Sequence, residues 1–191
     1  MNSDSALQIN TKPLDTESRT VDEIIAEDVS SFDRLYKENS QYIYNTCLGI
    51  LGSSEDARDA TQDTFVQFYR SLPKIRNGCA YRTWLYRVAV NKCMDIIRRH
   101  HRCAHVDSLD WFREECTSAD DNILEEHVRQ SILRLKPEYR AAIVLFYFQQ
   151  LSYAEIAESL GCSQSQVRTR LHRARKAFRL VFDNRGDDIE M

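Results

Sequence analysis

The sequence predicts an all-α protein of two small helical domains joined by a flexible linker, the C-terminal one a helix-turn-helix. Only five glycines and three prolines occur in 191 residues, too few for the many tight turns of a sandwich or barrel. Apolar residues recur at helical spacing behind capping residues, and no convincing strand-like alternation occurs. These observations favour helices throughout the two domains.

The composition predicts a packed protein inside the cell. Hydrophobic residues make up 42% and charged residues 29% of the chain, which allows a core. No apolar run approaches the roughly 18 residues of a membrane-spanning helix, and the polar N-terminus has no signal core. The six cysteines lack paired CxxC spacing. We therefore expect a cytoplasmic chain with reduced thiols and no membrane insertion.

Five segments follow from changes in periodicity and charge. We expect a polar, acidic, disordered tail over residues 1–29, a helical domain over 30–102, a linker over 103–120, a second helical domain over 121–182 and an acidic tail over 183–191.

Capping patterns delimit the helices of the first domain. Ser30-x-x-Asp33 opens a helix that Gly52 ends, and Ser53-x-x-Asp56 opens the next, which Pro73 stops. A third helix runs from about Tyr81 to His101. Helical spacing assigns Tyr81 and Trp84 to its buried side and leaves Tyr86 as the exposed ring.

The second domain begins with a helix opened by Ser118-x-x-Asp121, with Leu124, Val128, Ile132 and Leu135 facing inward. Pro137 starts the next helix. The strongest local motif follows: Ser152-x-x-Glu155 opens a short helix, Gly161 supplies the sharp turn, and Ser163 caps a final helix. This pattern predicts a DNA-binding helix-turn-helix.

The final helix has a basic face opposite its apolar one. Six basic residues and no acidic ones lie between Gln164 and Arg179, whereas a solvated helical hairpin, the plain alternative, usually mixes signs. Small and amide side chains come first, at base edges, and arginines follow, at phosphates. The predicted DNA-contacting residues are Ser163, Gln164, Ser165, Gln166, Arg168, Thr169, His172, Arg173 and Lys176.

An acidic stripe marks the second helix, where Asp56, Asp59 and Asp63 share one face with Gln62 beside them. Three carboxylates on one face repel each other unless a basic partner arrives. Compensation of the helix dipole explains Asp56 but not Asp63, which lies two turns in. A metal site lacks a nearby His or Cys. Contact with another protein is the preferred interpretation.

Residues 66–102 hold nine basic groups and one acidic group, although the whole chain carries a net charge of −3. Aromatic rings interleave with these basic groups on the third helix, a combination that suits single-stranded or melted nucleic acid. The candidate contacts are Asn77 in the preceding loop and Arg82, Tyr86, Arg87, Asn91, Asp95, Arg98 and Arg99.

Three ordered motifs resemble the extracytoplasmic-function (ECF) group of bacterial sigma-70 factors over residues 30–180 or so. Residues 55–65, EDARDATQDTF, resemble the helix that binds core polymerase. Residues 81–99 look like the helix that melts promoters and reads the −10 element. Residues 135–175 look like the domain that reads the −35 element. The first domain thus resembles sigma region 2 and the second sigma region 4.

The resemblance implies a role for each set of residues. Asp56, Asp59, Gln62 and Asp63 would dock on the clamp helices of the largest subunit of core RNA polymerase. The third helix and the Asn77–Ala80 loop would hold the unpaired −10 strand, and Gln164 to Arg173 would read the −35 duplex. The flap of the second-largest subunit and an anti-sigma factor, which can sequester the chain at the inner membrane face, are further implied partners. No catalysis and no cofactor are implied.

Two alternatives remain open on the residues alone. An ordinary helix-turn-helix regulator would explain residues 152–179 but not the acidic stripe or the third helix. Metal or redox sensing is suggested by four potential ligands at the start of the linker, which a frayed basic helix end also explains. These weak metal candidates are His100, His101, Cys103 and His105.

Overall fold

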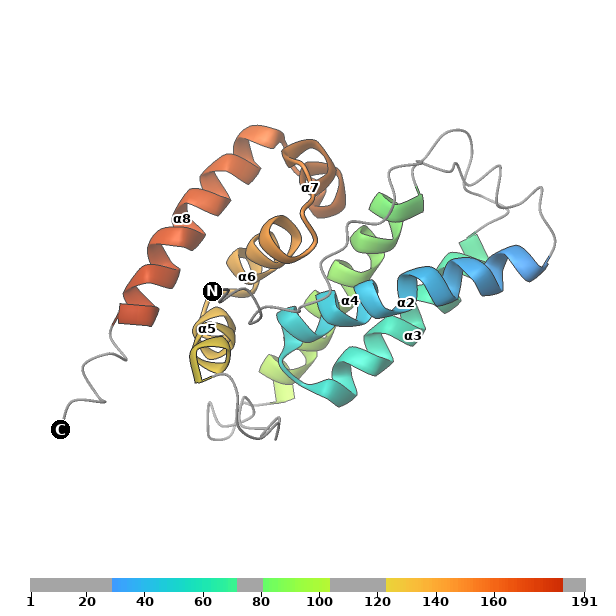
Figure 1. Ribbon diagram of the computed structural model, residues 1–191, viewed down its shortest axis with the longest axis horizontal. Helices are drawn as coiled ribbons and strands as arrows, with labels where there is room; N and C mark the ends of the chain where they lie inside the picture. Colours follow the sequence, from blue (N-terminus) through green and yellow to red (C-terminus); the bar gives the residue numbers. More distant parts are fainter. Residues whose placement is uncertain (1–28, 72–80, 104–122, 184–191) are drawn as a thin grey trace, which may run out of the picture.

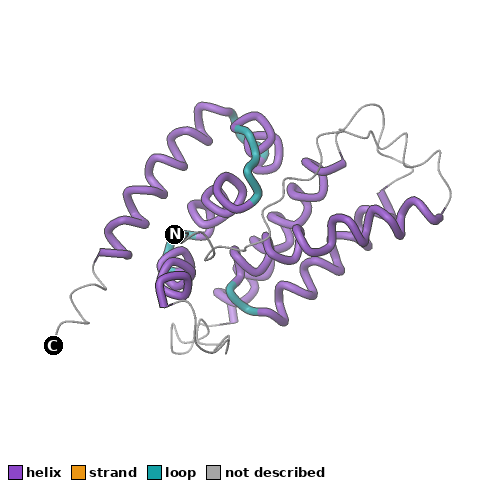
Figure 2. The backbone as a smooth tube through the Cα atoms, in the orientation of Figure 1, coloured by secondary structure: helices purple, strands orange, loops and turns teal. Residues whose placement is uncertain are grey.

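The computed structural model describes residues 29–71, 81–103 and 123–183, and all regular structure in these ranges is helical (Figure 2). The elements are α2 (Val29–Leu51), α3 (Ser54–Ser71), α4 (Tyr81–Cys103), α5 (Ile123–Leu133), α6 (Pro137–Ile143), the π-helical turn η3 (Val144–Phe148), α7 (Tyr153–Leu160) and α8 (Gln164–Asp183). The expected tails, most of the linker and Asn77 lie outside the described residues.

Helices α2, α3 and α4 form the first unit, and the described ends of these helices lie within two residues of the predicted ones. Gly52 ends α2 with a φ of +80°, and Ser53 caps α3 by accepting a hydrogen bond from the Asp56 amide at 3.2 Å. The apolar stripe of α3 is buried, as its spacing predicts. Phe68, the last buried residue of this stripe, has its ring centroid 5.3 Å from that of the Trp84 ring of α4.

Helices α5 to α8 form the second unit. Pro137 occupies the first turn of α6, and α7 begins with the expected capping box between Ser152 and Glu155. Gly161 has the left-handed backbone, φ 60°, that the turn into α8 requires. The inward placement of Leu124 was wrong, since it is 62% exposed. Leu124 lies in the first turn of α5, beyond the reach of the core around Ile132.

The two units pack against each other (Figure 1). Helix α4 contacts α7, and α2 contacts α5, α6 and η3, so one continuous core includes residues of both units. The close approach depends on two glycines of α2 and its end. A Cβ on Gly49 would lie 3.0 Å from a methyl carbon of Val144, and one on Gly52 would lie 2.9 Å from methyl carbons of Leu133. Two domains that the sequence joins only by a linker therefore share a core.

A buried arginine ties this interface together. Arg140 of α6 is 2% exposed and donates hydrogen bonds to the carbonyl oxygens of Ile50, across the interface, and of Leu135 in its own unit at 3.2 Å. Burial lowers the pKa of its guanidinium to about 10. The Ile50 carbonyl, one of the last carbonyls of α2 that lack a partner within the helix, is thus satisfied by the second unit.

Candidate nucleic-acid interface

The acidic stripe lies on α3 beside α4. Asp59, Gln62 and Asp63 are exposed and Asp56 is half-buried. The Lys92 ammonium of α4 lies 3.3 Å from an Asp63 carboxylate oxygen. Nε2 of His100, also on α4, lies 3.7 Å from an Asp56 carboxylate oxygen. The structure therefore gathers the four predicted residues on one face, with basic groups of α4 next to both ends of it.

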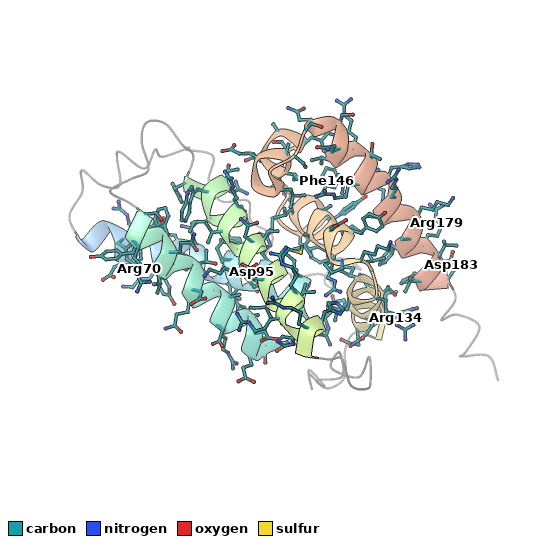
Figure 3. All side chains as sticks on the ribbon, turned by 180° about the vertical axis from the view of Figure 1, so that it is seen from behind. Arg70, Asp95, Arg134, Phe146, Arg179 and Asp183 are labelled. Atoms are coloured by element: carbon teal, nitrogen blue, oxygen red, sulfur yellow. The ribbon has the colours of Figure 1, made fainter. Side chains whose placement is uncertain are left out.

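One solvent-exposed stripe of α4 carries most of the predicted −10 residues. Its members recur at three- and four-residue spacing and are Arg87, Asn91, Asp95, Arg98 and Arg99. The Arg98 guanidinium pairs with the Asp95 carboxylate at 2.5 Å. Asp95 therefore holds Arg98 against the helix, as Figure 3 lets the reader follow around the labelled Asp95.

The second unit contacts two predicted −10 residues, of which Tyr86 is buried and Arg82 is half-buried. Tyr86 is 1% exposed, so the expectation of an exposed ring was wrong. Its hydroxyl donates to the side-chain oxygen of Gln149 at 3.0 Å, and the Arg82 guanidinium donates to the Gln149 carbonyl at 3.3 Å. Burial raises the pKa of Tyr86 to about 12. Helical spacing within the first unit could not reveal this, because the covering residues lie 63 or more positions away.

The metal candidates do not form a site in the described part of the chain. No group of three or more His, Cys, Asp or Glu side chains that could hold a metal ion lies among the described residues. His100 adjoins Asp56, and His101 is exposed at the end of α4. His105 and the side chain of Cys103 lie outside the described residues.

The predicted −35 residues lie along α8, away from the interface with the first unit. Helix α8 buries Val167, Leu171 and Ala174, while all nine predicted residues are exposed. Three of them also serve the helix itself. The Ser163 hydroxyl accepts from the Gln166 amide at 3.2 Å and the Gln166 side chain accepts from the Ser163 amide at 2.8 Å, while Thr169 bonds the Ser165 carbonyl. The Ser-x-x-Gln spacing of this second capping box was readable in the sequence.

Sequence reasoning missed two residues that shape these faces. Gln149 covers Tyr86, and no local sequence pattern predicts this contact. Arg175, seven residues after Arg168 on one flank of α8, donates a hydrogen bond to the Tyr147 hydroxyl at 2.9 Å. The shared helical flank of these two arginines was a signal that could have found it.

Comparison with known families places these faces in context. The chain matches the model described as Sigma-70 region 2 over residues 35–103 and the model described as Sigma-70, region 4 over residues 126–178. The first match holds α3 and α4, and the second holds the helix-turn-helix. No helix of the described residues is both long and apolar enough to cross a lipid bilayer.

Curated relatives agree with the family models. RNA polymerase sigma factor YlaC of Bacillus subtilis is 34% identical over 152 residues, covering 76% of this chain and 88% of YlaC. ECF RNA polymerase sigma factor SigW of the same organism is 32% identical, covering 76% of this chain and 83% of SigW. For ECF sigma factor SigE of Mycolicibacterium smegmatis, 31% identical, the match spans 60% of its length. The chain belongs to the sigma-70 family of RNA polymerase sigma factors, in its ECF group.

Solved structures share the fold. CnrH, in complex with the cytosolic domain of CnrY, superposes with a TM-score of 0.66 at 23% identity, over 86% of this chain and 95% of CnrH. Sigma factor RpoE of Bartonella quintana, in complex with the anti-sigma factor NepR, gives 0.68 at 20% identity, over 81% of this chain and 98% of RpoE.

Proposed function

We propose that this chain binds core RNA polymerase and directs it to promoters by reading a −10 and a −35 element. The proposal rests on three exposed charged faces of the folded chain. In the first unit α3 carries an acidic face and α4 a basic one, and in the second unit α8 carries a basic face. The chain itself catalyses nothing in this proposal, because the polymerase performs the chemistry. A run-off transcription assay with core polymerase and genomic promoter fragments tests it: start sites that depend on this chain support it, and their absence contradicts it.

The acidic face of α3 docks on the clamp helices of the largest polymerase subunit, while the second unit contacts the flap of the second-largest. Exposed carboxylates next to one another favour a basic partner, and Asp59 and Asp63 are the most accessible of them. Reversing both to lysine should abolish pull-down of core polymerase. The matched control is Glu38→Lys, a reversal on the exposed side of α2. Unchanged pull-down by the Asp59→Lys/Asp63→Lys variant would contradict this docking surface.

The packing of the two units supports a role for polymerase in separating them. Tyr86 and Arg82 cannot stack on or bind a DNA strand while Gln149 covers them. Core polymerase would hold the units apart at promoter spacing and thereby free this part of α4. A gel-shift experiment with the isolated chain and a promoter duplex tests the requirement, and tight sequence-specific binding without polymerase would contradict it.

A disulfide lock tests the separation directly. An ideal Cβ on Gly49 would lie 3.9 Å from the Cβ of Val144, within the span that a disulfide bridges. The oxidised Gly49→Cys/Val144→Cys variant should fail to open promoters with core polymerase, and reductant should restore transcription. Each single variant, treated with the same oxidant, is the control for the chain's own cysteines. Full transcription by the cross-linked variant would contradict the need for separation.

An anti-sigma factor fits as a regulator of the same faces. CnrH and RpoE share this fold and were solved with CnrY and with the anti-sigma factor NepR. We extend this partner class to the present chain, which would be cytoplasmic and held at the inner membrane face when its anti-sigma factor is membrane-bound. Co-purification of a small protein that blocks core binding tests this, and recovery of the chain only with polymerase contradicts it.

A further inference from the structure

An aromatic cluster holds two arginines on one flank of α8. The Arg175 guanidinium carbon lies 5.7 Å from the centre of the Phe146 ring and 5.9 Å from that of Tyr147, and the Arg168 carbon lies 5.9 Å from that of Tyr153. The Tyr147 hydroxyl accepts a hydrogen bond from Nε of Arg175 at 2.9 Å. The Phe146 and Tyr153 rings stack with 5.5 Å between their centroids, so the two arginines rest on one continuous platform.

The groups around Arg175 leave its positive charge uncompensated. The hydrogen bond with Tyr153 raises the pKa of Arg175 most, burial opposes this rise, and the hydrogen bond with Tyr147 adds a smaller increase. These partners are neutral phenols. The exposed Arg98, by contrast, is paired with the carboxylate of Asp95. An arginine fixed by neutral rings keeps its charge available to an external anion, and its bond to Tyr147 is made by Nε and not by a terminal nitrogen.

The position of the pair identifies the anion. Arg168 and Arg175 are seven residues apart, about 10 Å along the helix, on the flank between the buried residues of α8 and the exposed face of Thr169 and Lys176. A recognition helix in the major groove has base edges in front of it and the phosphate backbones along its flanks. Side chains on the flank therefore face phosphates rather than bases.

We propose that Phe146, Tyr147 and Tyr153 are positioning residues that hold Arg168 and Arg175 as a phosphate clamp on the duplex that α8 reads. The proposal rests on the DNA-reading role of α8 proposed above and adds Arg175 and the three aromatic residues to it. Tyr147 belongs to the π-helical turn η3, and it is 50% exposed although it carries a large apolar ring. In this proposal the Tyr147 ring is exposed because it supports Arg175, whose guanidinium must be accessible to bind DNA.

Fluorescence anisotropy of the full-length chain with a labelled random-sequence 24-bp duplex tests the clamp, since phosphate contacts do not depend on sequence. At low salt, Arg175→Ala should weaken binding about 5- to 10-fold and reduce the slope of log K against log salt by about 1. Tyr147→Phe, which removes one hydroxyl and no charge, should weaken binding about 3-fold by releasing the Nε hydrogen bond. Tyr69→Phe, at an exposed tyrosine of α3, is the matched control and should change nothing.

A double-mutant cycle separates positioning from a general structural role. If Tyr147 acts through Arg175, then Tyr147→Phe has no further effect in the Arg175→Ala background, and the thermal unfolding midpoints of the variants stay together. Equal losses from Tyr147→Phe in both backgrounds would overturn the proposal, as would an unchanged salt slope in Arg175→Ala. Unchanged DNA affinity combined with weaker pull-down of core polymerase would assign the cluster to a polymerase contact instead and overturn it as well. These outcomes are independent of the run-off assay, which tests the proposed function itself.

Discussion

Two arginine–tyrosine pairs in this molecule have the same chemistry and opposite environments. On α4 the Arg82 guanidinium carbon lies 5.8 Å from the centre of the Tyr86 ring, and between α8 and η3 the corresponding distance from Arg175 to Tyr147 is 5.9 Å. Tyr86 is 1% exposed and Tyr147 is 50% exposed. In the first pair the Tyr86 ring is buried under Gln149 of the other unit and Arg82 is half-buried, whereas both members of the second pair are exposed. Availability for nucleic acid is thus decided by what packs on a pair and not by the pair itself.

The difference makes the two helices proposed to face DNA unequally accessible in the packed state. Helix α8 presents its whole predicted face, whereas α4 presents only the stripe from Arg87 to Arg99. If α8 and α4 have the DNA-binding roles proposed above, a chain in this state meets a duplex through α8 before α4 can surround an unpaired strand. Substitutions at the contact between the units, and in the two helices themselves, test this difference in accessibility.

The largest effect is expected for Arg140→Ala, which removes the buried tie between the units. The Ile50 and Leu135 carbonyls lose their donor and a cavity remains, so the free energy of unfolding should fall by about 3 kcal/mol. Thermal or urea unfolding measures it, with Arg134→Ala, on the exposed surface before α6, as control. Because α8 keeps its face, duplex binding at a temperature where the variant is folded should be retained. An unfolding free energy equal to that of the wild type would deny Arg140 this role.

Gln149→Ala should uncover α4 more selectively. The Tyr86 hydroxyl would remain buried without its acceptor, which costs about 2 kcal/mol of packing between the units. We expect tighter binding of a single-stranded oligonucleotide by the isolated chain and unchanged duplex binding. The comparison variant is Gln67→Ala, on the exposed side of α3. If single-strand affinity does not rise, Gln149 is not what keeps α4 covered.

Alkaline pH should weaken the covered pair of Arg82 and Tyr86. The folded pKa of Tyr86, about 12, lies above the unfolded value near 10, so its stabilising contribution is complete below pH 10 and is lost as the pH rises toward 12. By pH 11 the loss should reach about 1.4 kcal/mol. The measurement is denaturant unfolding of the wild type and of Tyr86→Phe at pH 8 and pH 11. The free energy of unfolding should fall more between these two pH values in the wild type than in the variant. Identical pH dependence in the two proteins would contradict the burial of this hydroxyl.

The smallest effect concerns the start of α8. Gln166→Ala removes one half of the capping box between Ser163 and Gln166 and should lower the free energy of unfolding by roughly 0.5 kcal/mol. The chain's preference among −35 duplexes of different base sequence should not change. Ser165→Ala, one residue earlier and outside the capping box side-chain pair, is the stability control. Competition binding with single-base variants of the duplex decides the matter, since a changed preference would return Gln166 to a base-reading role.

Local rules predicted most element ends correctly. The helices begin or end where the local patterns predict, at Gly52, Pro137, Ser152 and Gly161. These ends are readable because caps and turns involve residues only three or four positions apart. The charged faces of α3 and α8 were equally readable, since they follow from helical spacing alone. The prediction for the first turn of α5 was wrong. Leu124 has the helical spacing of the buried residues that follow it, but the core around Ile132 does not extend to this turn.

A helical sigma-family chain with one acidic and two basic faces could be predicted from the amino-acid sequence, because helix formation, capping and face composition depend on near neighbours. The shared core of the two units, the burial of Arg140 at their junction and the burial of Tyr86 became visible only in the folded molecule. Those outcomes depend on contacts between residues 63 to 90 positions apart, such as Tyr86 with Gln149 and Arg140 with Ile50. A buried arginine and an exposed one look alike in a one-dimensional pattern, and only the surface that arrives from the other unit distinguishes them.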